Sequence, residues 1–144
     1  MELVLDTSVV VKWFVRPPEE DLEAALEVRR RVLEAELDLI IPDLMFYELA
    51  NVLRYQPQLR FEEVAVALDT LETMELDVRP FSSYLGKEAV RLANTTGITA
   101  YDAYFIVFAE AFECPLLTAD RRCYRRVKGR PSVNLLQAWD GIEA

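Results

Sequence analysis

The sequence predicts an α/β fold of three layers, in which helices cover both faces of a central parallel sheet of about five strands. Short, wholly apolar segments alternate with longer amphipathic ones, and fully apolar strands are typical of parallel sheets buried on both faces. The chain has 144 residues, a hydrophobic share of 52% and only four glycines. It can therefore bury one core without an obvious hinge, and we expect a single domain over residues 1–144.

The first half of the chain is divided by prolines. Pro17 and Pro18 precede an amphipathic helix whose first turn carries Glu19 and Asp21, acids that suit the positive end of a helix dipole. Pro42 ends a short apolar strand. The expected elements are a strand at 2–6, a short helix or turn at 7–14, helix 19–36, strand 38–41, and helices 43–55 and 61–74.

The second half repeats the alternation of strands and helices. Its most distinctive segment, AYDAYFIVFAEAF, is almost wholly apolar, which indicates a helix that is buried on most sides. The expected elements are a strand at 76–80, helices at about 83–95 and 100–112, a strand at 115–118, a basic helix or loop at 120–129, and a strand at 132–136.

The chain contains no histidine. This excludes Ser-His-Asp and Cys-His nucleophiles, a ribonuclease mechanism built on imidazole, and the usual zinc sites. Any catalytic metal must then be a hard cation held by oxygen, and Mg²⁺ or Mn²⁺ comes first.

Two cysteines and the absence of long apolar runs bear on the compartment. Cys114 and Cys123 match no common zinc spacing. We favour the interpretation that both are free thiols in a reducing cytoplasm, and a disulfide between them is the alternative. No apolar run reaches the roughly 18–20 residues that span a bilayer, so we expect a cytoplasmic protein without a membrane segment.

Four acids are expected to meet at one edge of the sheet. Asp6 ends the first strand and Asp120 directly follows the strand at 115–118. Glu48 lies within two turns of the start of the helix after the second strand, and Asp102 lies in the first turn of the helix before the fourth. These strand ends and helix starts all lie at the carboxyl edge of a parallel sheet, where ligands bind in open α/β folds.

Each acid alone also has an ordinary explanation, for example as a helix cap or a solvated position; Thr7 and Ser8 compete with Asp6 as a cap. Their combination is harder to explain in this way. Two carboxylates about 4 Å apart repel by roughly 4 kcal/mol at an effective dielectric near 20. A bound cation removes this conflict, and acid clusters that hold one or two metals can cleave phosphodiesters.

The chain has a formal net charge of −9, but residues 121–130 contain six basic residues and no acid. We expect Arg121, Arg122, Arg125 and Arg126 to contact a polyanion beside Asp120. The alternative is a solvated helix face that pairs with acids elsewhere. Lys12 is also available to neutralise phosphate, although a surface lysine is the simpler interpretation.

Four sequence blocks carry a resemblance to a known family. LDTSVVVKWF, YELANVLR, TAYDAYFIVFAE and LLTADRRCY resemble, in this order, the four acidic signatures of PIN-domain proteins, most closely the single-domain VapC toxins of toxin–antitoxin pairs. The resemblance implies a Mg²⁺- or Mn²⁺-dependent ribonuclease that acts on RNA. The polyanion that Arg121, Arg122, Arg125 and Arg126 contact would then be the RNA backbone. It also implies a homodimer that a cognate antitoxin inhibits by lying over the active site.

The resemblance also assigns roles to individual residues. Asp6 and Asp102 would be the leading metal ligands, and Glu48 and Asp120 would complete the acidic site. Among supporting residues, Ser8 follows the first acid closely, Thr118 would orient the last acid or a water, and Asn51 would support Glu48 from one turn away.

Two other functions compete with this one. A PIN scaffold could bind RNA or a protein without cutting, although intact acids argue against it. A phosphotransferase of the haloacid-dehalogenase type also ends its first strand in Asp. That family needs a second Asp two residues later, where this chain has Ser8.

Overall fold

The computed structural model describes residues 1–139 and contains the expected parallel sheet. All five strands are parallel and lie in the order β3-β2-β1-β4-β5. Their bounds are Glu2–Leu5 (β1), Asp38–Pro42 (β2), Asp77–Arg79 (β3), Leu116–Thr118 (β4) and Val133–Leu135 (β5). The predicted fold class is therefore confirmed.

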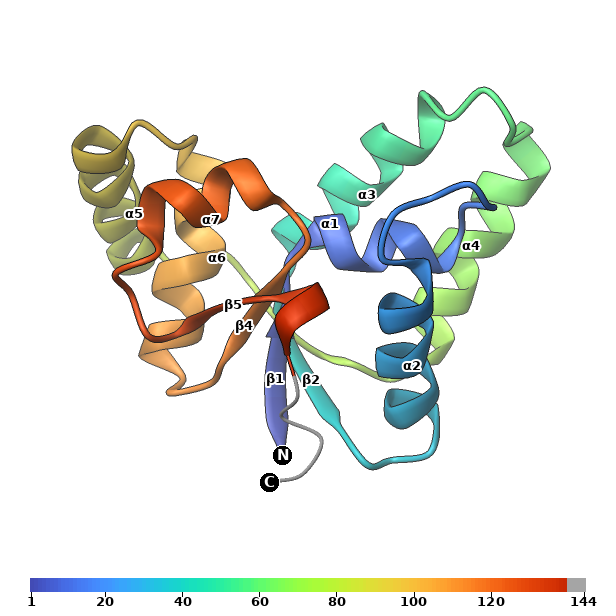
Figure 1. Ribbon diagram of the computed structural model, residues 1–144, viewed down its shortest axis with the longest axis horizontal. Coiled ribbons are helices and arrows are strands. Elements are labelled where there is room, and N and C mark those ends of the chain that lie inside the picture. Colours follow the sequence, from blue (N-terminus) through green and yellow to red (C-terminus); the bar gives the residue numbers. More distant parts are fainter. Residues whose placement is uncertain (140–144) are drawn as a thin grey trace.

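Helices cover both faces of this sheet. The first group is α1 (Thr7–Val10), the 3₁₀ helix η1 (Val11–Trp13), α2 (Leu22–Leu33), α3 (Leu44–Arg54) and α4 (Phe61–Thr73). The second group is α5 (Ser83–Thr96), α6 (Ala100–Ala111) and α7 (Arg121–Val127), and the 3₁₀ helix η2 (Leu136–Ala138) follows β5. In Figure 1 the blue-to-green helices lie on one side of the strands and the yellow-to-orange helices on the other.

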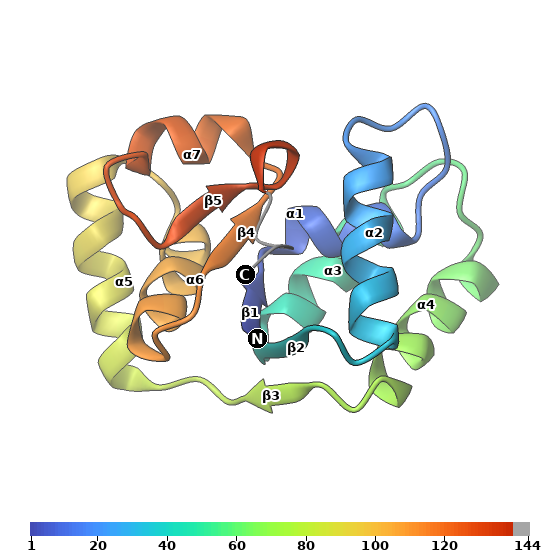
Figure 2. The ribbon, with the colours of Figure 1, turned by 60° about the horizontal axis from the view of Figure 1, so that its bottom comes forward.

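The direction of the chain reverses between β1 and β4. From β1 the chain proceeds to β2 and β3, and it then returns through α5 and α6 to place β4 on the other side of β1. Figure 2 shows β3 on the path that carries the chain from α4 back to α5. The carboxyl ends of β1 and β4 are therefore neighbours at the point where strand order reverses, the usual ligand site of such sheets.

The buried centre of the second layer is α6, which packs against β1 and β4. Seven consecutive residues of this helix, from Ala103 to Ala109, are buried. Phe105 and Phe108 are among the largest fully buried side chains. This packing confirms the sequence-based expectation of a helix enclosed on most sides, and it fixes the first turn of α6 at the carboxyl edge of the sheet.

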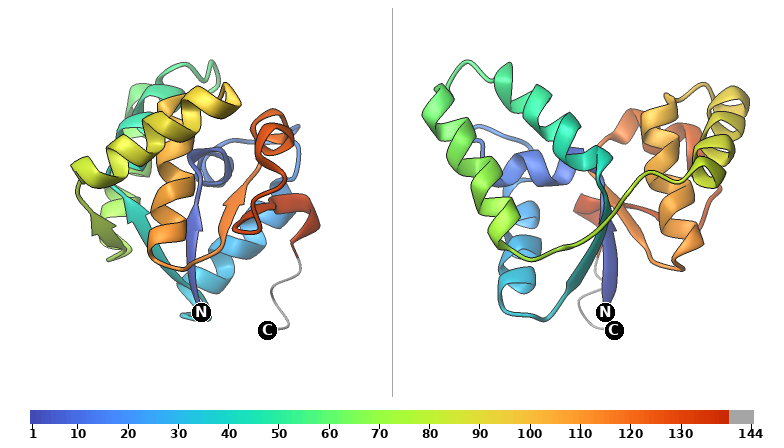
Figure 3. Two further views of the ribbon diagram at one scale, coloured as in Figure 1. Left: turned by 90° about the vertical axis from the view of Figure 1, so that its left-hand side faces the viewer. Right: turned by 180° about the vertical axis from the view of Figure 1, so that it is seen from behind.

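The first layer departs from expectation at the start of α2. The helix was expected from residue 19, but it begins at Leu22, because Asp21 has a left-handed backbone (φ 58°) that no helix continues. Glu19 therefore precedes the helix and is not in its first turn. Figure 3, from behind, shows α3 and α4 projecting beyond the sheet on the side opposite α5 and α6.

The remaining expectations concern cysteines and membranes. Cys114 is buried, Cys123 is half-buried, and both are free thiols. Within residues 1–139 no helix is both long and apolar enough to span a bilayer.

Candidate active site

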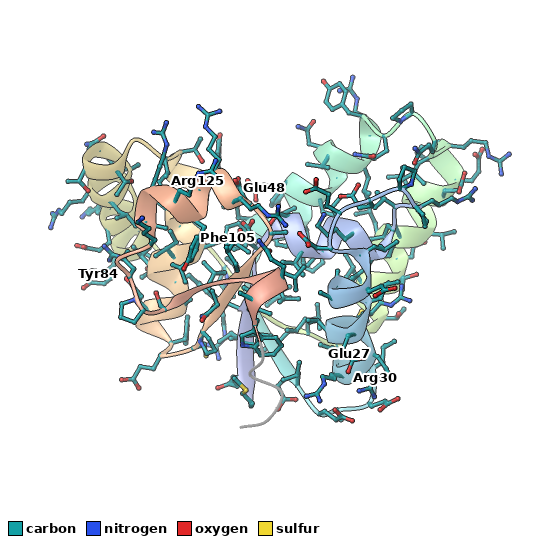
Figure 4. The ribbon with its side chains drawn as sticks, in the orientation of Figure 1. Glu27, Arg30, Glu48, Tyr84, Phe105 and Arg125 are labelled. Carbon is teal, nitrogen blue, oxygen red and sulfur yellow. The ribbon has the colours of Figure 1, made fainter. Side chains whose placement is uncertain are left out.

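The four predicted acids line one cavity at the carboxyl edge of the sheet. We call it the acidic cavity. Its volume is about 350 Å³, and its lining residues are Asp6, Thr7, Ser8, Val11, Lys12, Glu19, Glu48, Val52, Asp102, Ala119 and Asp120. Figure 4 labels Glu48 at the upper centre, between the two helix layers. The structure therefore brings together side chains from β1, α3, α6 and the end of β4, as the topology argument predicts.

Asp6 is the most enclosed of the four acids. Its side chain is 8% exposed, and Oδ2 accepts hydrogen bonds from the Ser8 hydroxyl (2.5 Å), the Thr118 hydroxyl (3.1 Å) and the Ser8 amide (3.3 Å). Burial raises the pKa of Asp6 above its usual value, while these hydrogen bonds oppose the rise. The two hydroxyls thus fix the orientation of Asp6 and oppose the rise in its pKa that burial causes.

Ser8, which follows β1, and Thr118, which ends β4, also link the carboxyl ends of these two strands. The Ser8 hydroxyl accepts from the Ala119 amide at 2.9 Å, and the Thr118 hydroxyl accepts from the Asp120 amide at 3.1 Å. Each hydroxyl therefore contacts Asp6 and the backbone just after β4. Thr118 was expected to orient the last acid or a water; its observed partners are the carboxylate of Asp6 and the backbone of Asp120.

Glu48 enters the cavity from the second turn of α3. Its Oε1 accepts a hydrogen bond of 2.7 Å from the Thr7 hydroxyl. Burial raises the pKa of Glu48 to about 6, and the charges of Asp6 and Asp102 add to the rise. The sequence did not point to Thr7 as a partner of Glu48, because the two residues lie on different helices and Thr7 had been considered only as a cap.

Asp102 and Asp120 complete the acidic wall. Burial raises the pKa of Asp102 to about 6, with smaller contributions from Asp6 and Asp120. Asp120 is the N-cap of α7 and accepts from the Cys123 amide at 2.9 Å. Asp120 therefore has both roles considered from the sequence: it caps a helix, and it lines the cavity.

The donor set suits a hard divalent cation, but its side chains do not converge on one point. Within residues 1–139 no three Asp, Glu or Cys side chains are arranged to hold a metal ion. The hydrogen bonds explain this arrangement, since Ser8 and Thr118 draw Asp6 to one side, Thr7 draws Glu48 to another, and Asp120 turns toward α7. Four carboxylate groups in one cavity nevertheless fit Mg²⁺ or Mn²⁺, and the pKa values of three of them, Asp6, Glu48 and Asp102, are raised.

Two polar residues near the site differ from expectation. Asn51 is exposed and is not a lining residue; Val52, also one turn from Glu48, lines the cavity instead. The turn of α3 that points Glu48 into the cavity leaves Asn51 exposed, and the structure gives no contact that supports its expected role. The sequence favours a surface position for Lys12, but in the structure its side chain is buried and lines the cavity.

The arginines of α7 fall into two groups. Arg122 and Arg126 line a second cavity of about 320 Å³ that shares Asp102 and Asp120 with the acidic cavity. Arg121 instead pairs with Asp21 at 3.3 Å. Arg125 is exposed, and Figure 4 shows it on the upper side of α7. Arg122 and Arg126 are thus the arginines that lie directly beside the acids.

The fold and the site define an α/β protein that gathers carboxylates where the strand order of a parallel sheet reverses. Residues 3–129 match the PIN domain, and the chain belongs to this family. It is 36% identical to "Ribonuclease VapC3" of Pyrobaculum aerophilum over 127 residues. This alignment covers 85% of this chain and 92% of that relative.

Solved structures share the fold at lower identity. A toxin–antitoxin complex from Klebsiella pneumoniae aligns with a TM-score of 0.68 and 17% identity, over 93% of this chain and 97% of that one. VapBC2 from Rickettsia felis, solved bound to a DNA fragment from its promoter, aligns with a TM-score of 0.64 and 19% identity, over 94% of this chain and 97% of that one.

Proposed function

We propose that this protein is a Mg²⁺- or Mn²⁺-dependent ribonuclease that hydrolyses RNA phosphodiester bonds. The observation that carries the proposal is the acidic cavity, in which Asp6, Glu48, Asp102 and Asp120 meet at the carboxyl edge of the sheet. The family relationship and the relative named as a ribonuclease support RNA as the substrate.

Each acid has a distinct supporting environment. In this proposal Asp6 and Asp102 are the leading metal ligands, and Glu48 and Asp120 complete the set. Ser8 and Thr118 orient Asp6, and Thr7 orients Glu48. A bound divalent cation supplies a nucleophilic water at neutral pH and stabilises the charge that develops on the phosphoryl group.

The proposed partners follow from position and from the relatives. Arg122 and Arg126 flank Asp102 and Asp120 in the second cavity, where a strand of RNA that enters the acidic cavity would pass. The solved structures include toxin–antitoxin complexes, and we propose that this chain is the toxin of such a pair, inhibited by its cognate antitoxin.

The proposal is tested with a panel of RNAs in the presence of Mg²⁺, Mn²⁺ or a chelator. We expect cleavage that requires metal and falls at least 100-fold in Asp6→Asn and Asp102→Asn, because each change removes a charged ligand. Glu27→Gln is the control: Glu27 pairs with Arg30 at the lower end of α2, far from Glu48 in Figure 4.

Cleavage that both Asn variants retain would contradict a metal nuclease centred on these acids. RNA that is bound but never cut, by wild-type protein in either metal, would instead favour a binding module.

A further inference from the structure

A buried lysine shares the acidic cavity with the four acids. The side chain of Lys12 is 8% exposed, and its Nζ donates to Glu19 Oε1 and to the Glu20 carbonyl, each at 2.6 Å. Among the lining residues of the acidic cavity within residues 1–139, Lys12 is the only cation and faces five acids. Its charge is therefore held at the site by a dedicated pair of acceptors.

The backbone fixes Lys12 relative to the first acid. Asp6 caps α1, α1 continues directly into η1, and Lys12 is the middle residue of η1. One short, buried helical segment thus carries the most enclosed carboxylate at its start and the lysine near its end. Glu19 reaches Lys12 because the chain before α2 folds back over η1.

We propose that Lys12 is a positioning residue that donates a hydrogen bond to a non-bridging phosphate oxygen of RNA in the acidic cavity, an inference that rests on the proposed ribonuclease function. An ammonium group has three N–H donors, and two of them are taken by Glu19 and Glu20. The third is left for a ligand.

The electrostatics of the cavity favour a phosphate as that ligand. Carboxylates repel a polyanion, so RNA needs a cation inside the cavity as well as arginines at its side. Lys12 supplies this charge from the wall formed by η1, whereas Arg122 and Arg126 belong to α7. RNA would therefore be held between cations that come from opposite helix layers.

A purely structural role is the competing explanation. Breaking a buried ion pair by removing one partner is destabilising, and Lys12 joins η1 to the segment before α2. Loss of activity in a Lys12 variant would therefore decide nothing by itself. The test must measure a property that depends on the number of phosphate contacts.

The salt dependence of RNA affinity is such a property. Binding of a single-stranded oligoribonucleotide is measured without divalent metal in Asp102→Asn protein, which leaves the RNA intact, at several salt concentrations. Adding Lys12→Met should weaken affinity about tenfold at low salt and reduce the slope of log K against log[salt] by about 0.7, the loss of one phosphate contact.

Matched variants separate charge from packing. Lys12→Arg should keep most of the slope, because it keeps a donor and a charge. Lys87→Met removes an exposed lysine on α5 and should leave the slope unchanged. Lys12→Met can destabilise the fold because it leaves Glu19 without its partner. The double variant Lys12→Met/Glu19→Gln removes both charges of the pair. It should show the same reduced salt slope and a melting temperature closer to that of wild-type protein.

Each result decides between the two roles. A lower melting temperature with an unchanged salt slope would overturn the proposal and show that Lys12 only stabilises the fold. If wild-type protein neither cuts RNA with metal nor binds it, the ribonuclease proposal itself fails. If wild-type protein cuts RNA and the slope does not change with Lys12, only the Lys12 proposal fails.

Discussion

At the scale of single residues, Asp6 shows two opposing influences on the pKa of a buried carboxyl group. Burial favours the neutral acid, whereas the hydroxyls of Ser8 and Thr118 favour the carboxylate. In the proposed metal site Asp6 must be deprotonated, so these hydroxyls would support function without touching the ion.

Thr118→Val tests this balance with a nearly isosteric change. The variant loses the donor to Asp6 and leaves the Asp120 amide without its acceptor. We expect the free energy of unfolding to fall by about 1–3 kcal/mol. The acid limb of RNA cleavage should move to higher pH, because a hydrogen bond that lowers the pKa of Asp6 is gone.

Urea unfolding and pH–rate profiles measure these two effects. Thr70→Val is the control, because the Thr70 hydroxyl donates to a carbonyl on the exposed side of α4. An acid limb that stays in place in Thr118→Val would argue against the supporting role of this hydroxyl.

The pH dependence of metal-free stability follows from Glu48 and Asp102. Folding raises the pKa of each to about 6, so the folded state binds protons more tightly than the unfolded one. Their contribution to stability is therefore present below the unfolded pKa values, near 4, and is lost as pH rises through about 6.

Glu48→Gln should accordingly raise the melting temperature of metal-free protein at pH 7 and have little effect at pH 4.5, as differential scanning fluorimetry can measure. Mn²⁺ should stabilise wild-type protein more than the variant. Glu72→Gln, at an exposed position of α4, should change neither result. An unchanged melting temperature in Glu48→Gln at pH 7 would show that Glu48 carries no burial cost.

At the scale of elements, some arginines of residues 121–130 form ion pairs within the fold, and others lie beside the acids of the cavity. Arg130 binds both carboxylate oxygens of Glu110 at 2.9 and 3.0 Å and so ties α6 to the segment before β5. Arg122 faces the second cavity beside the acids. Arg130 thus fits the ion-pair explanation considered from the sequence, and contact of Arg122 with RNA stays a prediction.

Arg130→Met and Arg122→Met should therefore have opposite effects. The first should lower the free energy of unfolding by about 1 kcal/mol, because a two-pronged ion pair is lost, and leave RNA affinity unchanged. The second should weaken RNA binding and leave stability unchanged. Urea titrations and filter binding measure both, and equal RNA affinities in the two variants would contradict the division.

The sequence predicted the elements better than their contacts. Strands and helices follow from apolar periodicity, so all five strands and the order of the helices could be predicted. The start of α2 could not, because it depends on the left-handed backbone of Asp21. The pairing of Lys12 with Glu19 depends in turn on how the chain before α2 folds back, which periodicity does not reveal.

At the scale of the whole molecule, the position of the four acids was predictable because topology alone places them. Strand ends and helix starts share one edge of a parallel sheet whatever the side chains do. The direction of each carboxylate was not predictable, since it is set by hydroxyls from other elements, such as Thr7 on α1 for Glu48.

One exposed apolar groove lies outside the acidic cavity. It lies between α3, α5 and α6, has a volume of about 780 Å³, and is lined by the exposed side chains of Tyr47, Phe81, Val90 and Tyr101. Exposed apolar surface of this kind marks protein interfaces. Since the family resemblance implies a homodimer, we predict that a second copy of this chain covers the groove.

Sedimentation velocity tests this prediction. Wild-type protein should sediment as a dimer and Val90→Glu as a monomer, because a charge at a half-exposed position of the groove cannot be buried without a partner. Val66→Glu, at a similarly exposed valine on α4, should remain dimeric. A dimer that survives Val90→Glu would place the interface elsewhere.

The reversal of strand order also determines when the acidic cavity can form during synthesis. Asp6 and Ser8 leave the ribosome early, but their partner Thr118 is 112 and 110 positions later in the chain. Neither β4 nor the first turn of α6 exists until most of the polypeptide has been translated. Nascent chains interrupted before residue 118 would therefore carry Asp6 and Glu48 without a site, so premature termination should release inert fragments.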